Sequence, residues 1–123
     1  MIMGIDVTHP SKSDRLGNSI ASIVGSYDSK MVNYYAKCVV QPKPRLEVVQ
    51  LDEVTKELIE NFKAKNGFCP DYVLVYRDGV SDGQFNEVID KEINLMKKAF
   101  AAISKETGTP YEPKITFIVV QKR

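Results

Sequence analysis

The sequence has 123 residues, of which 43% are hydrophobic and 27% are charged, and its formal net charge is +1. This length suits one domain, and the composition fits an ordinary soluble globular protein. No apolar run approaches the roughly 20 residues that a membrane-spanning helix needs. No signal-peptide pattern follows Met1, so we expect no membrane partner.

Charge is distributed unevenly along the chain. Residues 1–46 carry six basic and three acidic side chains, residues 47–92 carry five and eleven, and residues 93–123 carry six and two. An acidic middle between basic ends fits a metal site beside phosphate contacts, or else acidic side chains on solvated helix faces. Cys38 and Cys69 have no metal-ligand spacing, which favours buried, reduced thiols in a cytoplasmic protein, with the nucleus as the alternative.

The N-terminal part of the chain predicts three strands. Thr8–Asn18 is polar and contains Pro and Gly, which is typical of a loop. Short links between strands favour antiparallel neighbours, because a parallel crossover needs a dozen or more residues. The predicted strands are Met1–Ile5, which leads into Asp6, then Ser19–Gly25 and Tyr34–Val40.

A helical pattern follows the breaks at Pro42 and Pro44. Asn66-Gly67 supplies its C-terminal stop, because Gly readily takes the left-handed conformation. The apolar residues at helical spacing are Val48, Leu51, Val54, Leu58 and Phe62.

The last part of the chain predicts two strands on either side of a second helix. Tyr72–Tyr76 is a continuous apolar run, which is typical of a strand buried on both faces. Ser81 and Gln84 match a capping box, and Gly108 follows the end of the periodic segment. The final strand is Ile115–Val120, and the apolar helix residues are Phe85, Val88, Ile89, Ile93, Met96, Phe100 and Ile103.

The predicted order is βββαβαβ in a single α/β domain. Strands separated by helices imply right-handed parallel crossovers, so we predict a mixed sheet that begins antiparallel and continues parallel. Open α/β sheets bind ligands at the carboxyl ends of strands, where the strand order reverses. The first and fourth strands flank that point, and they lead to Asp6 and Asp78.

Two carboxylates at neighbouring strand ends can bridge a hard divalent cation. Such metals can orient a nucleophilic water and stabilise the leaving oxygen of a phosphodiester. Mg²⁺ or Mn²⁺ is the expected ion, because oxygen ligands dominate and the sequence has no soft-ligand cluster. The alternative is a pair of structural aspartates, since Asp78-Gly79 is a turn dipeptide.

Three motifs carry a resemblance to a known family. They are GIDVTHP (residues 4–10), YRDGVSDGQF (residues 76–85) and ITFIVVQKR (residues 115–123). In this order and at these separations they resemble the PIWI domain of eukaryotic Argonautes. The resemblance covers nearly the whole chain and implies a ribonuclease-H-like fold.

Cleaving members of that family use a DEDX tetrad, in which X is usually His or Asp. The resemblance assigns its first member to Asp6 and its third to Asp78. The glutamate, which a loop brings into the site, most resembles Glu47 in PRLEVVQ. Glu53 and Glu57 remain rivals, although both fit solvated helix positions.

The fourth tetrad residue lies downstream of the QKR segment in the family. The resemblance therefore implies the N-terminal portion of a PIWI domain, residues 1–123, with the remainder of the Argonaute chain missing. We expect no cleavage by this portion alone. Apolar area left without its partner surface would favour self-association.

Several other residues are weaker candidates. Arg77 should point away from Asp78 and form a buried ion pair rather than contact substrate. His9 could touch phosphate, but a structural hydrogen bond is the plainer interpretation. The remaining candidates for nucleic-acid contact are Lys12, Arg15, Lys122 and Arg123.

The resemblance implies one of two functions. The first is a guide-directed endoribonuclease of RNA interference, in which a small guide RNA pairs with a complementary target RNA and the protein recognises the A-form duplex. The second is a non-cleaving Argonaute that binds guide RNA and silences through other proteins of a silencing complex. A different ribonuclease-H-like nuclease or transposase is a remote third, which YRDGVSDGQF disfavours.

Overall fold

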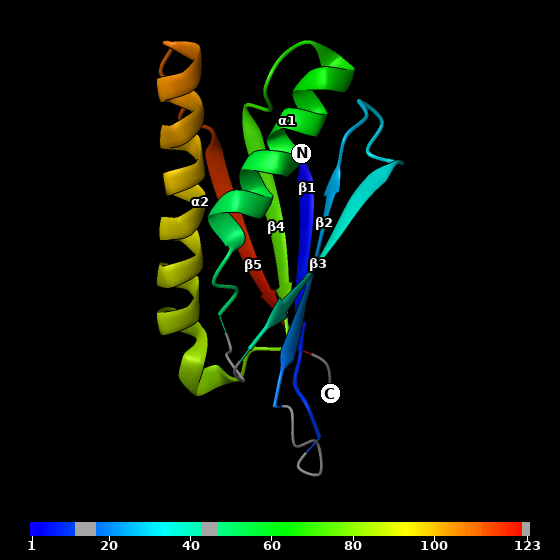
Figure 1. The fold of residues 1–123 in the computed structure, drawn as a ribbon, viewed down its shortest axis with the longest axis vertical. Helices are drawn as coiled ribbons and strands as arrows, with labels where there is room; N and C mark the ends of the chain where they lie inside the picture. The colour runs from blue at the N-terminus through cyan, green and yellow to red at the C-terminus, as the bar shows by residue number, and fades with distance from the viewer. Residues whose placement is uncertain (12–16, 43–46, 122–123) are drawn as a thin grey trace.

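The computed structural model describes residues 1–11, 17–42 and 47–121. They form five strands, two long helices and one short 3₁₀ helix, Asp82–Gln84 (Figure 1). The strands are β1 (Ile2–Thr8), β2 (Ser19–Ser26), β3 (Tyr34–Gln41), β4 (Tyr72–Asp78) and β5 (Lys114–Val120). The helices are α1 (Leu51–Asn66) and α2 (Phe85–Thr107).

The strands make one sheet in the order β3-β2-β1-β4-β5. β1, β2 and β3 are antiparallel neighbours, whereas β4 runs parallel to both β1 and β5. This confirms the predicted element order and the mixed sheet. It also confirms that the order reverses between β1 and β4, the strands that carry Asp6 and Asp78.

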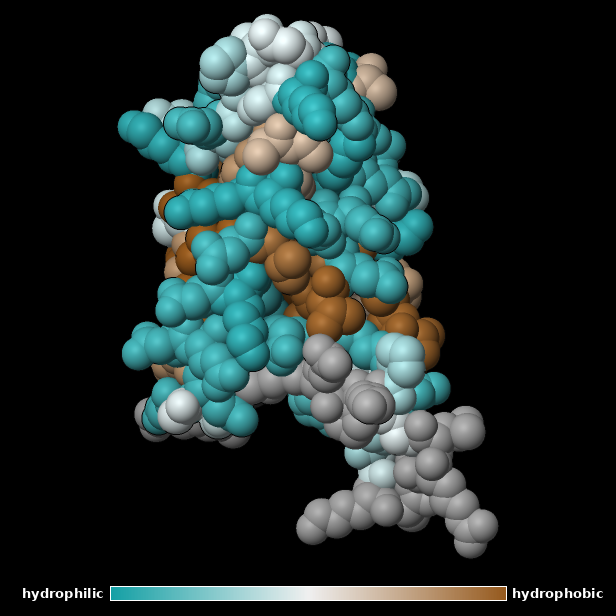
Figure 2. All heavy atoms as spheres, turned by 60° about the vertical axis from the view of Figure 1, so that its left-hand side comes forward, coloured by the Kyte–Doolittle hydropathy of each residue, from teal (hydrophilic) through white to brown (hydrophobic). Residues whose placement is uncertain are grey.

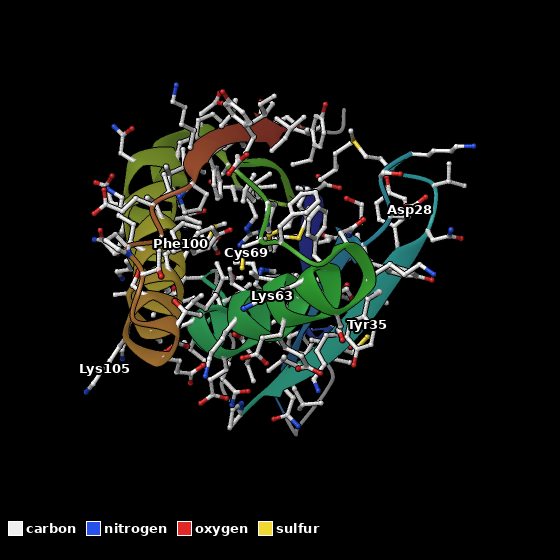
Figure 3. The ribbon with its side chains drawn as sticks, turned by 90° about the horizontal axis from the view of Figure 1, so that it is seen from above. Asp28, Tyr35, Lys63, Cys69, Phe100 and Lys105 are labelled. Carbon is white, nitrogen blue, oxygen red and sulfur yellow. The ribbon has the colours of Figure 1, made fainter. Side chains whose placement is uncertain are left out.

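Both helices cover the same face of the sheet, where they lie side by side (Figure 3). Alternate residues of each strand point to that face. Met3, Ile5 and Val7 of β1 and Val73 and Val75 of β4 are therefore buried against the helices. Further core residues are Ala21, Ile23, Val39, Leu51, Val54, Leu58, Ile59, Met96, Phe100 and Ile103.

The opposite face of the sheet has no cover among the described residues. Tyr72 and Tyr76 expose 64% and 42% of their surface, so the prediction that this strand is buried on both faces is wrong. Its apolar run is continuous, but only the side that faces the helices has a packing partner. The other large hydrophobics exposed on this open face are Ile20, Tyr34, Val40, Ile118 and Val120.

The first strand extends further than its apolar run predicts. β1 continues to Thr8, because Asp6, Val7 and Thr8 pair with Ser22, Ala21 and Ile20 of β2. Asp6 is therefore an interior strand residue rather than the residue after a strand. The predicted loop consequently begins at His9.

The helix starts differ from their sequence signals. α1 begins at Leu51 rather than Val48, whose backbone N–H instead donates to the Glu92 side chain. The Ser81 hydroxyl donates to Gln84 Oε1 at 2.6 Å and caps no backbone N–H, so the capping box does not form. The predicted stops are confirmed, because Gly67 and Gly108 both take the left-handed conformation after a helix.

The outer surface on the α2 side is largely hydrophilic, with apolar atoms gathered across its middle (Figure 2). Within the described ranges, neither helix is long and apolar enough to cross a membrane. Cys38 is exposed and Cys69 is half-buried, so the expectation that both thiols are buried is wrong. Cys38 lies on β3 and, by strand alternation, on the open face of the sheet.

Candidate metal centre

Asp6 and Asp78 lie side by side on β1 and β4, two neighbouring strands in the interior of the sheet. The parallel register of β1 and β4 pairs Ile5 with Arg77, so the next residues on the two strands are these aspartates. Ile5 and Arg77 point into the core. Strand alternation therefore directs both carboxylates to the open face.

The two aspartates line a shallow hollow of about 420 Å³ at the carboxyl end of β4. Gly79 lines the same hollow and lies beside both aspartates. Its backbone N–H donates to Asp78 Oδ1 at 2.7 Å. A Cβ built on Gly79 would lie 3.1 Å from Asp6 Oδ1. The rest of the lining comes from Val80, Ser81, Val120 and Gln121.

The donor atoms at this hollow fit a hard divalent cation. Mg²⁺ is commonly bound through one or two carboxylates, with water completing its shell. Asp6 and Asp78 are two carboxylates that line one hollow. Over residues 1–11, 17–42 and 47–121, no group of three or more His, Cys, Asp or Glu side chains converges on a common point. Within the described residues, the hollow therefore offers two carboxylate oxygen donors and no larger ligand cluster.

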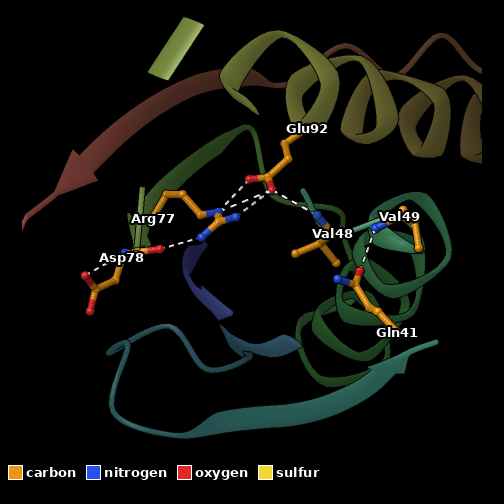
Figure 4. Close-up of polar contacts among 7 residues, drawn as sticks. Gln41, Val48, Val49, Arg77, Asp78 and Glu92 are labelled. Atoms are coloured by element: carbon orange, nitrogen blue, oxygen red, sulfur yellow. Dashed lines mark hydrogen bonds and ion pairs between the residues drawn. The ribbon is translucent and has the colours of Figure 1, made fainter. Parts of the chain in front are cut away.

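A buried ion pair between Arg77 and Glu92 lies next to Asp78 (Figure 4). The Arg77 guanidinium donates to the Glu92 carboxylate at 2.8 Å, and both side chains are 0% exposed. Arg77 also donates to the backbone carbonyl of Asp78, while Glu92 accepts the N–H of Val48 at 3.1 Å. This network joins the end of β4, α2 and the segment before α1. The predicted burial of Arg77 in an ion pair is thereby confirmed.

Glu92 is the residue that sequence reasoning missed. It lies four residues after Val88 and four before Met96, within the apolar stripe of α2. An acidic residue at a core position needs a buried partner. The signal was therefore present in the sequence as an acid at a core position, although the sequence does not identify Arg77 as its partner.

The structure does not bring Glu47 to the hollow. Glu47 Oε1 lies 3.8 Å from Lys91 Nζ, and its side chain is 22% exposed. It directly precedes Val48, so it is one residue away from the Arg77–Glu92 network. Its assignment to the site stays a prediction.

The rival glutamates are also placed away from the hollow. Glu57 accepts the Tyr35 hydroxyl at 2.9 Å and pairs with Lys37 at 3.3 Å, which ties α1 to β3. This hydrogen bond from Tyr35 to the carboxylate of Glu57 is the main reason that the pKa of Tyr35 is raised. Glu53 is exposed on α1.

His9 lies just after β1, and its Nδ1 is 3.2 Å from the buried Ser19 hydroxyl oxygen. This contact joins the end of β1 to the start of β2 and matches the structural role considered for His9. The other candidates for nucleic-acid contact, Lys12, Arg15, Lys122 and Arg123, lie outside the described residues.

A larger groove of about 850 Å³ lies apart from the carboxylates, between α2 and the segment that leads into β5. Phe100 and Tyr111 meet there edge to face, with ring centroids 5.6 Å apart. The Tyr111 hydroxyl donates to the Pro70 carbonyl at 2.6 Å. Burial raises the pKa of Tyr111 well above its usual range. Nothing at this groove resembles the paired carboxylates.

The chain is similar to known proteins over its whole length. The family model described as "Piwi domain" matches residues 1–123. "Protein argonaute 18" of Oryza sativa subsp. japonica is 42% identical over 124 residues, which cover 100% of this chain and 11% of the relative. "Putative protein tag-76" of Caenorhabditis elegans is 42% identical over 125 residues, which cover 100% of this chain and 12% of the relative.

Solved structures show the same fold. The C-terminal lobe of a budding yeast Argonaute superposes with a TM-score of 0.88 at 29% identity, covering 99% of this chain and 24% of that one. Kluyveromyces polysporus Argonaute with a guide RNA gives a TM-score of 0.87 at 31% identity, covering 99% and 14%. The fold is therefore the ribonuclease-H-like α/β fold of Argonaute PIWI lobes.

Proposed function

The chain belongs to the Piwi domain family, and from this we propose that it supplies two metal-binding carboxylates to an Argonaute that cleaves target RNA. Its homology to Argonautes supports a role in small-RNA-guided function. The chain spans only 11% and 12% of the two curated relatives, so cleavage belongs to the longer protein.

The placement of Asp6 and Asp78 in one hollow supports this proposal most directly. Two strand-end aspartates could serve as turn residues on separate sides of the sheet. Here both point away from the helices and line the same depression. Nearby charge on the core side is neutralised, because Arg77 is bound by Glu92. On the open side, the two carboxylates line the hollow together with Gly79, Val80, Ser81, Val120 and Gln121.

Asp6 and Asp78 would hold Mg²⁺ or Mn²⁺ in this proposal. Such an ion makes a water nucleophilic near neutral pH and stabilises charge on phosphodiester oxygens. Neighbouring residues of the protein orient the Asp78 carboxylate. The N–H of Gly79 holds one oxygen of Asp78, and Arg77 anchors the backbone carbonyl of the same residue. Glu47 would complete the site after movement of the segment that carries it.

The proposed partners are a small guide RNA, a complementary target RNA, other silencing-complex proteins and the rest of the Argonaute chain. One solved relative of this fold is an Argonaute with a guide RNA, which supports RNA as the ligand. We propose the cytoplasm as the site of action, with the nucleus as the alternative. Self-association of the isolated chain through its open face stays a prediction.

The test uses the full-length protein loaded with a guide RNA. Cleavage of a matched target should require Mg²⁺ or Mn²⁺ and disappear in Asp6→Ala and in Asp78→Ala. Asp90→Ala is the matched control, because Asp90 is exposed on α2. Unchanged cleavage in either site variant would contradict the proposal.

The second candidate function is a non-cleaving Argonaute that binds guide RNA and silences through partner proteins. The position of Glu47 beside Lys91, outside the hollow, favours it. The identity of the fourth site residue in the full-length protein separates the two functions. His or Asp at that position supports cleavage, whereas an apolar residue supports binding alone.

A further inference from the structure

Gly79 donates a hydrogen bond to one carboxylate of the candidate metal centre and lies beside the other. Its N–H donates to Asp78 Oδ1 at 2.7 Å. The position that a Cβ would occupy on Gly79 is 3.1 Å from Asp6 Oδ1. The backbone of one residue therefore binds Asp78 and leaves no room for a side chain beside Asp6.

We propose that Gly79 is a positioning residue for metal binding, which keeps the carboxylate of Asp6 close to that of Asp78. The inference rests on the proposed function of the hollow. It does not follow from the sequence motif, in which Gly79 reads simply as the second residue of a turn dipeptide. It follows from the direction in which a side chain at this residue would point.

A side chain at Gly79 would displace Asp6 before any other group. The built Cβ lies 3.6 Å from the Val7 carbonyl oxygen and 3.9 Å from Arg77 Nη1, which are ordinary contact distances. Only its 3.1 Å approach to Asp6 Oδ1 is too tight. The Asp6 side chain can yield by rotating, so the steric conflict is relieved at the expense of the ligand position.

The size of that displacement decides its effect. Relief of a contact this tight requires the neighbour to move by a few tenths of an ångström. Metal–ligand distances in well-formed sites lie within about 0.2 Å of their usual values. A shift of the Asp6 carboxylate by this distance costs little folding stability but disturbs the distance from that carboxylate to a bound metal. Metal affinity should therefore respond far more than stability does.

The chain provides a matched control for the backbone conformation. Gly79 has φ +83°, and Gly67 has φ +84°. Apart from Gly67 itself and its two chain neighbours, no heavy atom of the described residues lies within 4 Å of a Cβ built on Gly67, which ends α1. Ala at either position meets the same left-handed strain. Only the substitution at Gly79 also meets a carboxylate.

The experiment measures Mn²⁺ binding by electron paramagnetic resonance in the guide-loaded, full-length protein. Asp6→Ala supplies the background from Mn²⁺ bound by RNA. We expect Gly79→Ala to raise the half-saturating Mn²⁺ concentration about 10- to 100-fold, the range typical for groups that orient ligands. Gly67→Ala should leave it unchanged, and both variants should bind guide and target normally and melt at similar temperatures.

A second pair of variants covers the case in which Gly79→Ala does not fold. Asn tolerates the left-handed region better than Ala and carries the same Cβ. Gly79→Asn should therefore weaken Mn²⁺ binding while Gly67→Asn does not. Equal Mn²⁺ affinity in the Gly79 and Gly67 variants would overturn the inference but leave the proposed function standing. An unsubstituted protein that binds no more Mn²⁺ than Asp6→Ala would contradict both.

Discussion

The guanidinium of Arg77 binds the carboxylate of Glu92 inside the core, where neither side chain reaches solvent. The two residues are 15 apart in the sequence and come from β4 and α2. Their contact places a charged network next to Asp78 of the candidate metal centre. Stability and site geometry therefore share the same residues.

Removing one member of this pair should destabilise the protein strongly. Glu92→Met leaves the Arg77 charge buried without its partner, so we expect a loss of about 3–5 kcal/mol in the free energy of unfolding. Arg77→Met combined with Glu92→Met should lose much less than the sum of the single variants. Urea unfolding measures all three. Additive losses would show that the pair is not coupled in the way the structure indicates.

Thr55 offers a substitution in the opposite direction. Its hydroxyl is fully buried on α1 and has no hydrogen-bond partner among the described residues. Thr55→Val keeps the shape and removes the unsatisfied group, so we expect stabilisation of about 1 kcal/mol. Thr116→Val on the exposed side of β5 is the control and should stay within about 0.5 kcal/mol. Clear destabilisation by Thr55→Val would reveal a partner for the hydroxyl.

Tyr111 should make stability depend on alkaline pH. Burial raises the pKa of its hydroxyl in the folded state, so folding favours the protonated form. Its contribution is complete below the unfolded pKa of about 10 and declines as the pH rises above that value. Tyr111→Phe should therefore reduce the loss of stability between about pH 10 and pH 11. Tyr76→Phe, at an exposed tyrosine, is the control, and an identical pH profile in both variants would refute the assignment.

Glu47 can be separated from its rivals by cleavage assays in the full-length, guide-loaded protein. We expect Glu47→Ala to abolish target cleavage while guide binding persists. Glu53→Ala and Glu57→Ala should keep cleavage, because one is exposed on α1 and the other is bound by Tyr35 and Lys37. Loss of cleavage in Glu57→Ala alone would transfer the role to that residue.

Lys91 pairs with Glu47 at the protein surface. Its ammonium lies 3.8 Å from Glu47 and 2.9 Å from Glu87, and its side chain is half exposed. Exposed ion pairs contribute about 1 kcal/mol or less and are screened by salt. Lys91→Ala should therefore remove the Lys91–Glu47 ion pair with little loss of stability. If Glu47 moves to the site, cleavage in this variant should be retained or faster; clearly slower cleavage would contradict this account.

Local patterns were sufficient for the order of the elements. Helical spacing placed α1 and α2, because burial on one side of a helix repeats along the chain at a regular interval. Short continuous apolar runs between turn signals placed β4 and β5. The stops at Gly67 and Gly108 were also readable, since both need a left-handed backbone. The reversal of strand order between β1 and β4 then followed from the connections alone.

Boundaries and coverage were decided by contacts between distant segments. β1 reaches Thr8 because β2 pairs with it, and α1 starts late because Glu92 binds the N–H of Val48. The open face of β4 carries the same apolar residues as a buried face. Its exposure reflects the absence of a covering element in the described residues, which no local pattern records.

The sequence by itself determined which residues are acidic at the two central strands, and its motifs pointed to Asp6 and Asp78. Only the tertiary structure decided that their carboxylates line one hollow and that Gly79 lies beside both of them. It also decided that Arg77, paired with Glu92 in the core, binds the backbone carbonyl of Asp78. The physical reason is the sequence separation of the contacts involved. Periodicity reports which side of an element is buried, whereas register and packing between elements set which side chains meet.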